Sequence, residues 1–194
     1  PFLRGIIGHL APGTPDFPAQ LERFLRDSRF LGIRIGGAQL AAASPALLDD
    51  LRRLADTGLA LDVLGGPAPY TDAARVSDRL PNLRLVLHHL PNEAARDAAA
   101  LPEMARRPNV YAKVSGVLRR GVTDPAAYRG PLDALWAHFG ADRLLYASNW
   151  PVSDLVAPYA EVLRTVQTYV AAKPLEARDG FFWRNAHTVY RIPQ

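Results

Sequence analysis

Short apolar runs of strand length alternate with longer amphipathic segments along the whole chain. The runs begin about 24 to 33 residues apart, which is the size of a βα unit. Parallel strands joined through helices follow right-handed crossovers, so the pattern predicts a parallel sheet covered by helices. The six predicted strands are Leu3–Ile7, Leu31–Ile35, Leu59–Leu64, Leu83–Leu87, Val110–Val114 and Arg143–Tyr146.

A predicted helix follows each strand. The clearest one begins after Ser44, a good N-cap, has Pro45 at its first helical position and ends before Gly58. Leucine side chains between these residues share one face, as expected for a helix that packs against a sheet. The other predicted helices are Phe17–Phe30, Thr71–Leu80, Asn92–Arg107, Asp124–Phe139 and Asp154–Lys173.

The side-chain pattern favours a barrel over an open, doubly wound sheet. Side chains alternate between the two faces of a strand, and on one face of each of three strands the polar residues come near the C-terminal end. This distribution suits a barrel whose interior is packed with apolar side chains and whose functional groups lie at the C-terminal mouth. A nucleotide-binding sheet would need a glycine-rich turn after its first strand, and Gly5–Leu10 is too apolar for one. On the same alternation, His88 is expected to face the helices. The three faces hold Gly32, Arg34 and Gly36, then Leu85, Leu87 and His89, and then Leu145, Ala147 and Asn149.

Composition narrows the class of protein. With 194 residues, 48% hydrophobic and 22% charged, the chain can form a single domain over residues 1–194. The formal charge is +4, but the arginines are scattered among acids, which favours a solvated surface over a nucleic-acid interface. No apolar run approaches the roughly 20 residues that cross a bilayer, so we expect a soluble protein, cytoplasmic by default, with no membrane partner. The absence of cysteine excludes disulfides, thiolate metal sites and a cysteine nucleophile.

Four motifs at strand ends resemble one known family in their order and spacing. They are similar to the amidohydrolase-related family that includes sugar-lactone and 2-pyrone-4,6-dicarboxylate lactonases. The segment from Phe181 to Tyr190 is similar to the family's C-terminal helix. The motifs are Leu31–Arg34, Leu85–Leu90, Asn109–Gly116 and Ser148–Val152.

The resemblance implies a (β/α)8 barrel of the TIM type. Family members begin with a strand that bears a His-x-His pair and continue with a second βα unit, and neither precedes Pro1. We therefore expect about six βα units here, forming one amidohydrolase-like barrel domain that is incomplete at its N-terminus.

Two polar residues toward the C-terminal ends of their strands are the first candidates for catalysis and binding. His89 is expected in the barrel mouth, where a neutral imidazole can polarise a carbonyl or bind a metal, and the family uses its matching histidine in the site. Arg34 lies between Gly32 and Gly36, whose missing side chains admit a ligand, so its guanidinium can hold a carboxylate through two hydrogen bonds. The alternative for Arg34 is a structural ion pair with Asp62 or another acidic residue of the barrel.

Three further residues each have two interpretations. Lys113 shares a strand face with Tyr111 and Ser115 and supplies either a second cationic contact to substrate or a structural charge. His9 follows a buried strand and either binds substrate or makes an ordinary hydrogen bond. Asp62 lies inside an apolar strand, where a carboxylate needs a partner, so it is either an ion-pair partner or an acid-base group.

Asn149 departs from the family pattern, whose last-strand signature is usually Gly-Ser-Asp-Trp-Pro. An asparagine cannot take a proton, so Asn149 is expected to position water or to hydrogen-bond substrate. The resemblance implies a hydrolase of a lactone or related cyclic ester with a small anionic or polyhydroxylated substrate. A decarboxylase of the same superfamily and a catalytically silent barrel that binds a small ligand are the alternatives. Activity of this chain alone and a homo-oligomeric state stay undecided.

A metal is the remaining cofactor question. Catalytic zinc normally has three protein ligands, and this chain offers His89 with His9 as a doubtful second. We therefore expect a divalent metal such as zinc only in a complete chain, where residues outside this sequence would join His89, and none bound by this chain alone.

Overall fold

A six-stranded parallel sheet forms the centre of the computed structural model, which describes residues 2–41, 43–65, 69–90, 100–122 and 124–193. Each strand pairs with the strand before it along the chain, so the sheet order is the sequence order. The predicted α/β fold with six parallel βα units of the TIM-barrel type is confirmed. The strands are β1 (Ile6–Gly8), β2 (Phe30–Gly36), β3 (Ala60–Leu64), β4 (Arg84–Leu90), β5 (Val110–Val114) and β6 (Leu144–Tyr146).

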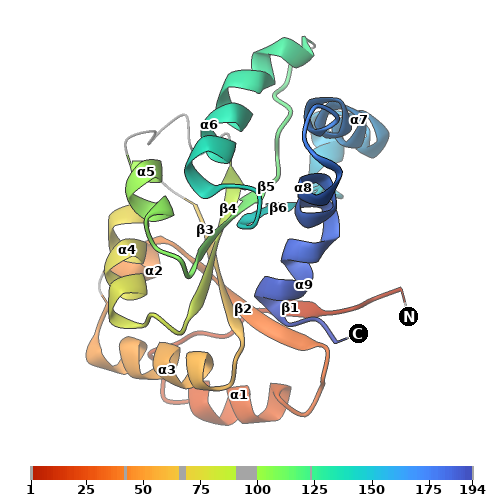
Figure 1. Ribbon diagram of the computed structural model, residues 1–194. Helices are drawn as coiled ribbons and strands as arrows, with labels where there is room; N and C mark the ends of the chain where they lie inside the picture. The colour runs from red at the N-terminus through yellow and green to blue at the C-terminus, as the bar shows by residue number, and fades with distance from the viewer. Residues whose placement is uncertain (1, 42, 66–68, 91–99, 123, 194) are drawn as a thin grey trace.

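Helices pack around this sheet (Figure 1). The helix predicted over Phe17–Phe30 ends at Phe24, and the one predicted from Asp124 begins as a 3-10 turn that Asp124 caps at the backbone N–H of Ala126. Part of the predicted helix over residues 92–107 lies outside the described residues. The helices are α1 (Phe17–Phe24), α2 (Ala38–Ala41), α3 (Pro45–Asp56), α4 (Pro69–Arg79), α5 (Ala100–Ala105), η1 (Pro125–Tyr128), α6 (Arg129–Phe139), η2 (Val152–Leu155), α7 (Tyr159–Val170), α8 (Leu175–Asp179), η3 (Gly180–Arg184) and α9 (Asn185–Tyr190).

Helix α3 illustrates how the sequence pattern becomes packing. The Ser44 hydroxyl accepts a hydrogen bond from the backbone N–H of Leu47 at 3.2 Å, which confirms the predicted N-cap. Leu47, Leu51 and Leu54 are buried against the sheet, and burial of each leucine stabilises the fold by about 2 kcal/mol. Among the described residues, no helix is both long and apolar enough to cross a membrane.

The two faces of the sheet have separate apolar cores. The larger core lies between the strands and the helices, and it contains Leu85 and Leu87. The prediction that these two leucines face the barrel interior was therefore wrong. A smaller cluster on the inner face joins Val86 and Leu145 to Val189 and Tyr190 near the C-terminus.

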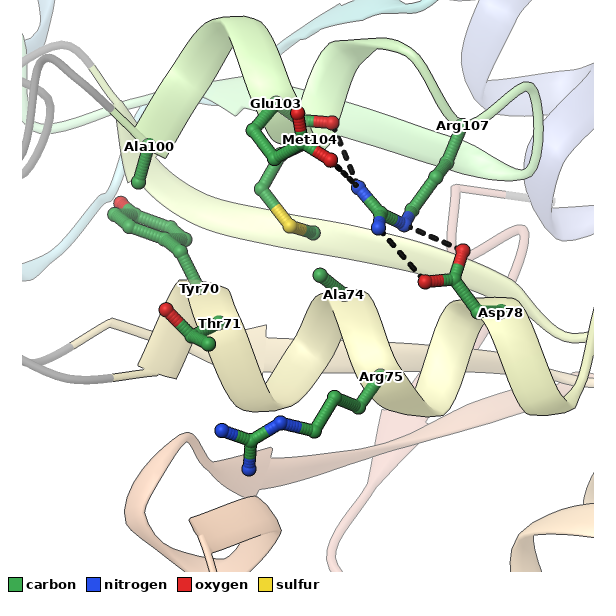
Figure 2. A pocket seen from close by; sticks show the side chains of 9 residues that line it. All are labelled: Tyr70, Thr71, Ala74, Arg75, Asp78, Ala100, Glu103, Met104 and Arg107. Atoms are coloured by element: carbon green, nitrogen blue, oxygen red, sulfur yellow. Dashed lines mark hydrogen bonds and ion pairs between the residues drawn. The ribbon is translucent and has the colours of Figure 1, made fainter.

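The outer layer includes a groove of about 450 Å³ between α4 and α5 (Figure 2). Arg107 connects the two helices: its guanidinium donates two hydrogen bonds to Asp78, at 2.8 and 2.7 Å, and it also contacts Glu103. Tyr70 and Met104 form the apolar side of the groove. These ion pairs hold α4 and α5 together.

The C-terminal helix α9 lies beside β1, so the two ends of the described chain are neighbours (Figure 1). The Arg4 guanidinium donates to the carbonyl of Pro193 at 2.5 Å, and Arg84 donates to the carbonyls of Val189 and Gly58. These contacts hold Tyr190 against the inner face of the sheet.

Candidate active site

A β-bulge in β4 decides where His89 points. Leu87 pairs with Ala112 and Leu90 with Val114, so three steps along β4 match two along β5, and His89 takes a left-handed conformation with φ of 60°. Regular alternation from the outward-facing Leu87 places His88 on the inner face of the sheet, and the bulge then turns His89 toward the mouth. The predicted outward orientation of His88 was therefore wrong, although His89 lies where it was expected.

Three neighbouring strand ends carry residues with positive φ. His89 follows this pattern on β4, Gly116 has φ of 58° after β5, and Asn149 has φ of 59° after β6. A methyl group on Gly116 would lie 3.6 Å from Asn149 Nδ2 and 3.7 Å from His89 Nδ1, so the three residues meet. Left-handed conformations of non-glycine residues cost free energy and concentrate at functional sites, which marks this mouth as the candidate active site.

These residues border a cavity of about 480 Å³ at the carboxyl ends of the strands. Arg34, His89 and Asn149 form its polar floor, and the Arg34 side chain is 46% exposed there. Ser115 Oγ lies 3.1 Å from His89 Nδ1 and fixes the imidazole ring. The other side of the cavity is an aliphatic wall, built from Leu64, Val117, Leu118, Val152, Leu155, Val156 and Val162.

A buried polar cluster, centred on Asp62, supports the floor. Asp62 is fully buried, and its Oδ2 lies 2.5 Å from His88 Nε2, 3.0 Å from Lys113 Nζ and 3.9 Å from Arg34 Nη2. Its other oxygen, Oδ1, accepts a hydrogen bond from the Tyr190 hydroxyl at 2.8 Å. The structure thus brings together three of the predicted site residues, Arg34, Asp62 and Lys113, below the cavity.

The charges of this cluster perturb one another. Burial alone would raise the pKa of Asp62, but the hydrogen bond from His88 and the charge of Lys113 lower it to about 2. Burial lowers the pKa of His88 to about 4 even though Asp62 opposes the change. Burial also lowers the pKa of Lys113 and raises that of Tyr190 well above its ordinary value. His88 is therefore neutral at pH 7 and donates from Nε2 to the Asp62 carboxylate.

The contacts of His9 and Tyr190 differ most from those expected from the sequence. His9 is exposed, and its Nδ1 lies 3.2 Å from the carbonyl oxygen of Arg34, so it contacts the backbone of β2. Tyr190 was not among the predicted site residues, and 128 positions separate it from its partner Asp62. The one sequence signal for this contact is the buried carboxylate itself, which required hydrogen-bond donors from somewhere in the chain.

Comparison with known proteins fits this fold. A family model described as amidohydrolase matches residues 2–192. The chain belongs to the amidohydrolase family. This membership confirms the resemblance of the strand-end motifs.

Among curated proteins, this amidohydrolase is 30% identical over 172 residues to L-fucono-1,5-lactonase of Burkholderia ambifaria, with 82% of this chain and 59% of that protein covered. The chain thus spans about 59% of that relative's length. A crystal structure of an amidohydrolase from Burkholderia multivorans with bound zinc superposes with a TM-score of 0.87, at 24% identity and covering 98% of this chain and 74% of that one. A Pseudomonas putida protein assigned as a 2-pyrone-4,6-dicarboxylic acid hydrolase has a TM-score of 0.70, at 21% identity and covering 96% and 71%. These two solved structures establish likeness of fold.

The side chains that the structure describes do not match a zinc site in this amidohydrolase. Nowhere among them do three His, Cys, Asp or Glu side chains converge as metal ligands. His88 and Asp62 are close together, but the Lys113 ammonium lies 2.9 Å and 3.0 Å from their facing atoms, so a cation already occupies that position. His89 would need ligands from elsewhere, and the zinc expected in a complete chain stays a prediction.

Proposed function

We propose that this amidohydrolase hydrolyses a lactone or related cyclic ester of a small anionic substrate. The observation that carries the proposal is the convergence of His89, Gly116 and Asn149, all with positive φ, around a cavity whose floor also holds Arg34. The likeness to L-fucono-1,5-lactonase supports a lactone as the substrate class.

His89 acts as the general base. Of the polar side chains that the structure describes around the cavity, its imidazole has a ring nitrogen that can accept a proton, whereas Arg34 and Asn149 cannot accept one. The imidazole ring of His89, whose Nδ1 lies 3.1 Å from Ser115 Oγ, takes a proton from water. That water attacks the lactone carbonyl carbon, the ring C–O bond breaks, and the proton passes to the leaving ring oxygen, which gives the hydroxy acid.

Asn149 and Arg34 orient the reactants. Asn149 hydrogen-bonds the attacking water or the carbonyl, and the exposed guanidinium of Arg34 binds the anionic group of the substrate with two parallel hydrogen bonds. Asp62 and Lys113 act as positioning residues, because their ion pair is buried and holds Arg34 from below. No step is assigned to a metal.

The test is hydrolysis of a lactone panel by the purified protein, followed as acid release with a pH indicator. His89→Ala should lower kcat/KM by at least about 100-fold, the usual contribution of a general base, and leave the free energy of unfolding nearly unchanged. His138→Ala is the matched control, because His138 is exposed on α6, and it should retain full activity.

Three other outcomes would contradict the proposal. Equal activity of the His89→Ala variant and the unaltered protein would remove the proposed base. Release of carbon dioxide from a hydroxybenzoate, without lactone hydrolysis, would favour the decarboxylase hypothesis. Ligand binding with no turnover of any substrate would favour a catalytically silent barrel.

A further inference from the structure

The rim of the cavity exposes an unusual concentration of apolar side chains. Of the twelve large hydrophobic side chains exposed among the described residues, five lie between Trp150 and Tyr159. Three of them belong to the cavity wall: Val152 is 57% exposed, Leu155 71% and Val156 42%. Exposed apolar side chains that gather beside a polar site mark a binding surface, because contact with water costs free energy that an apolar ligand removes.

The wall continues directly into the polar floor. Val117 follows β5 next to Gly116, and Val152 lies three residues after Asn149, so one cavity joins aliphatic carbon to the Arg34 guanidinium. The polar and apolar sides come from different elements, since Arg34 and His89 are strand residues whereas Val152 and Leu155 belong to η2. A ligand that fills the cavity must therefore present a polar end and an apolar side together.

We propose that the aliphatic wall of the cavity, chiefly its members Val117, Leu118, Val152, Leu155 and Val156, selects lactones that carry an alkyl or aryl substituent, in preference to polyhydroxylated sugar lactones. This inference rests on the proposed lactone hydrolysis but specifies which lactones are taken. A ring hydroxyl pressed against these side chains would lose its hydrogen bonds to water and gain none from them, whereas each buried methylene of a substituent improves binding about fourfold.

The experiment measures kcat/KM of the purified protein across δ-valerolactone, its 5-alkyl derivatives from methyl to pentyl, and glucono-δ-lactone. None of these lactones carries an anionic group for Arg34, so differences within the series report the contribution of the wall. We expect kcat/KM to rise about threefold to fourfold with each added methylene over the first few carbons, and glucono-δ-lactone to be the poorer substrate. Leu155→Asn should flatten this series. Leu175→Asn is the matched control, since Leu175 is 65% exposed on α8 and does not border the cavity, and it should leave the series unchanged.

Binding of the matching alkyl δ-lactams keeps this test separate from the test of hydrolysis. Trp150, 63% exposed beside the wall, reports binding through its fluorescence, and Trp150→Phe identifies its signal. Lactam affinity that rises with chain length and is lost in Leu155→Asn supports the inference even if no lactone is hydrolysed.

Several results would overturn the inference. A preference for glucono-δ-lactone would do so while leaving the proposed function intact, and so would the same chain-length dependence in Leu155→Asn as in the unaltered protein. A dimer of the unaltered protein that Leu155→Asn dissociates, seen by light scattering, would assign the wall to contact between two copies instead.

Discussion

Replacement of Asp62 by Asn tests whether the buried cluster holds the site together. The substitution removes the negative charge from a fully buried side chain while keeping its size. The Lys113 ammonium, 3.0 Å from Oδ2, would then be buried beside neutral His88 without a counter-charge. Breaking one side of a buried ion pair typically costs about 3 to 5 kcal/mol, so we expect the free energy of unfolding to fall by about 4 kcal/mol.

Urea unfolding at pH 7, followed by circular dichroism, measures this loss, with an unchanged m-value as the sign that only stability has changed. Asp50→Asn is the matched control. Asp50 is 7% exposed and accepts a hydrogen bond from the backbone N–H of Gly13 at 2.7 Å, and its other partner, Arg53, is exposed. No buried cation is left unpaired there, so that variant should lose only about 1 kcal/mol.

A second variant keeps the reasoning testable if Asp62→Asn does not fold. The double variant Asp62→Asn/Lys113→Met also removes the unpaired Lys113 ammonium. Its free energy of unfolding should be about 1 to 3 kcal/mol higher than that of Asp62→Asn alone. A loss in Asp62→Asn no larger than in Asp50→Asn would refute the buried ion pair as a source of stability. A double variant less stable than the single one would refute it equally.

Three further outcomes are expected. The pKa of His88 in the folded protein, about 4, lies below its ordinary value of 6.5, so between these pH values the unfolded state binds more protons than the folded state. The free energy of unfolding should therefore fall by up to about 3 kcal/mol from pH 6.5 to pH 4. In urea titrations His88→Gln should abolish this pH dependence, whereas His138→Gln should keep it. Gly116→Ala should lose about 1 to 2 kcal/mol in urea unfolding, since φ of 58° strains any side chain, and equal or greater stability would contradict that argument. Ser153→Ala should gain up to about 1 kcal/mol in thermal unfolding, because its buried hydroxyl has no partner among the described residues, and a loss would indicate a hydrogen bond to water there.

The order of strands and helices was predictable because local periodicity and capping carry that information. The residues at which the strands and helices begin and end were less predictable. The first strand was expected at Leu3–Ile7 but pairs with β2 over Ile6–Gly8, where the register also shifts. Pairing partners lie far away in sequence, so a single apolar run does not say which of its residues enter the sheet.

The orientation of β4 could not be read from hydrophobicity. Both faces of a parallel strand in this fold are apolar, so Leu85 and Leu87 fitted either face equally well. The charged residues within strands were the better guide: Arg34 pairs in register with Asp62, and Lys113 meets the same carboxylate, which places His88 on their face. A bulge then brings His89 to the mouth, and no sequence signal indicated it.

The cavity was only half predictable for a related reason. Arg34, His89 and Asn149 are polar groups at strand ends, which topology alone collects at one mouth. The aliphatic wall was not predicted because Val152 and Leu155 are of the same residue types as the core, so the sequence does not distinguish them from core residues. Only their 57% and 71% exposure in the folded chain distinguishes them from the core.

The buried cluster and the cavity are linked through their charge balance. Arg34 and Lys113 are two cations against the single carboxylate of Asp62, and burial with these cations keeps His88 neutral rather than adding a third positive charge. Lys113 is the closer partner of Asp62, at 3.0 Å against 3.9 Å, so the uncompensated positive charge belongs to Arg34, which is 46% exposed at the cavity floor. An anionic group bound there would meet that charge beside an aliphatic wall, and a ligand that displaces water from the wall would strengthen the Coulomb attraction relative to bulk solvent. The wall and the cluster therefore favour the same ligand, with its charge held at the floor and its carbon skeleton against the wall.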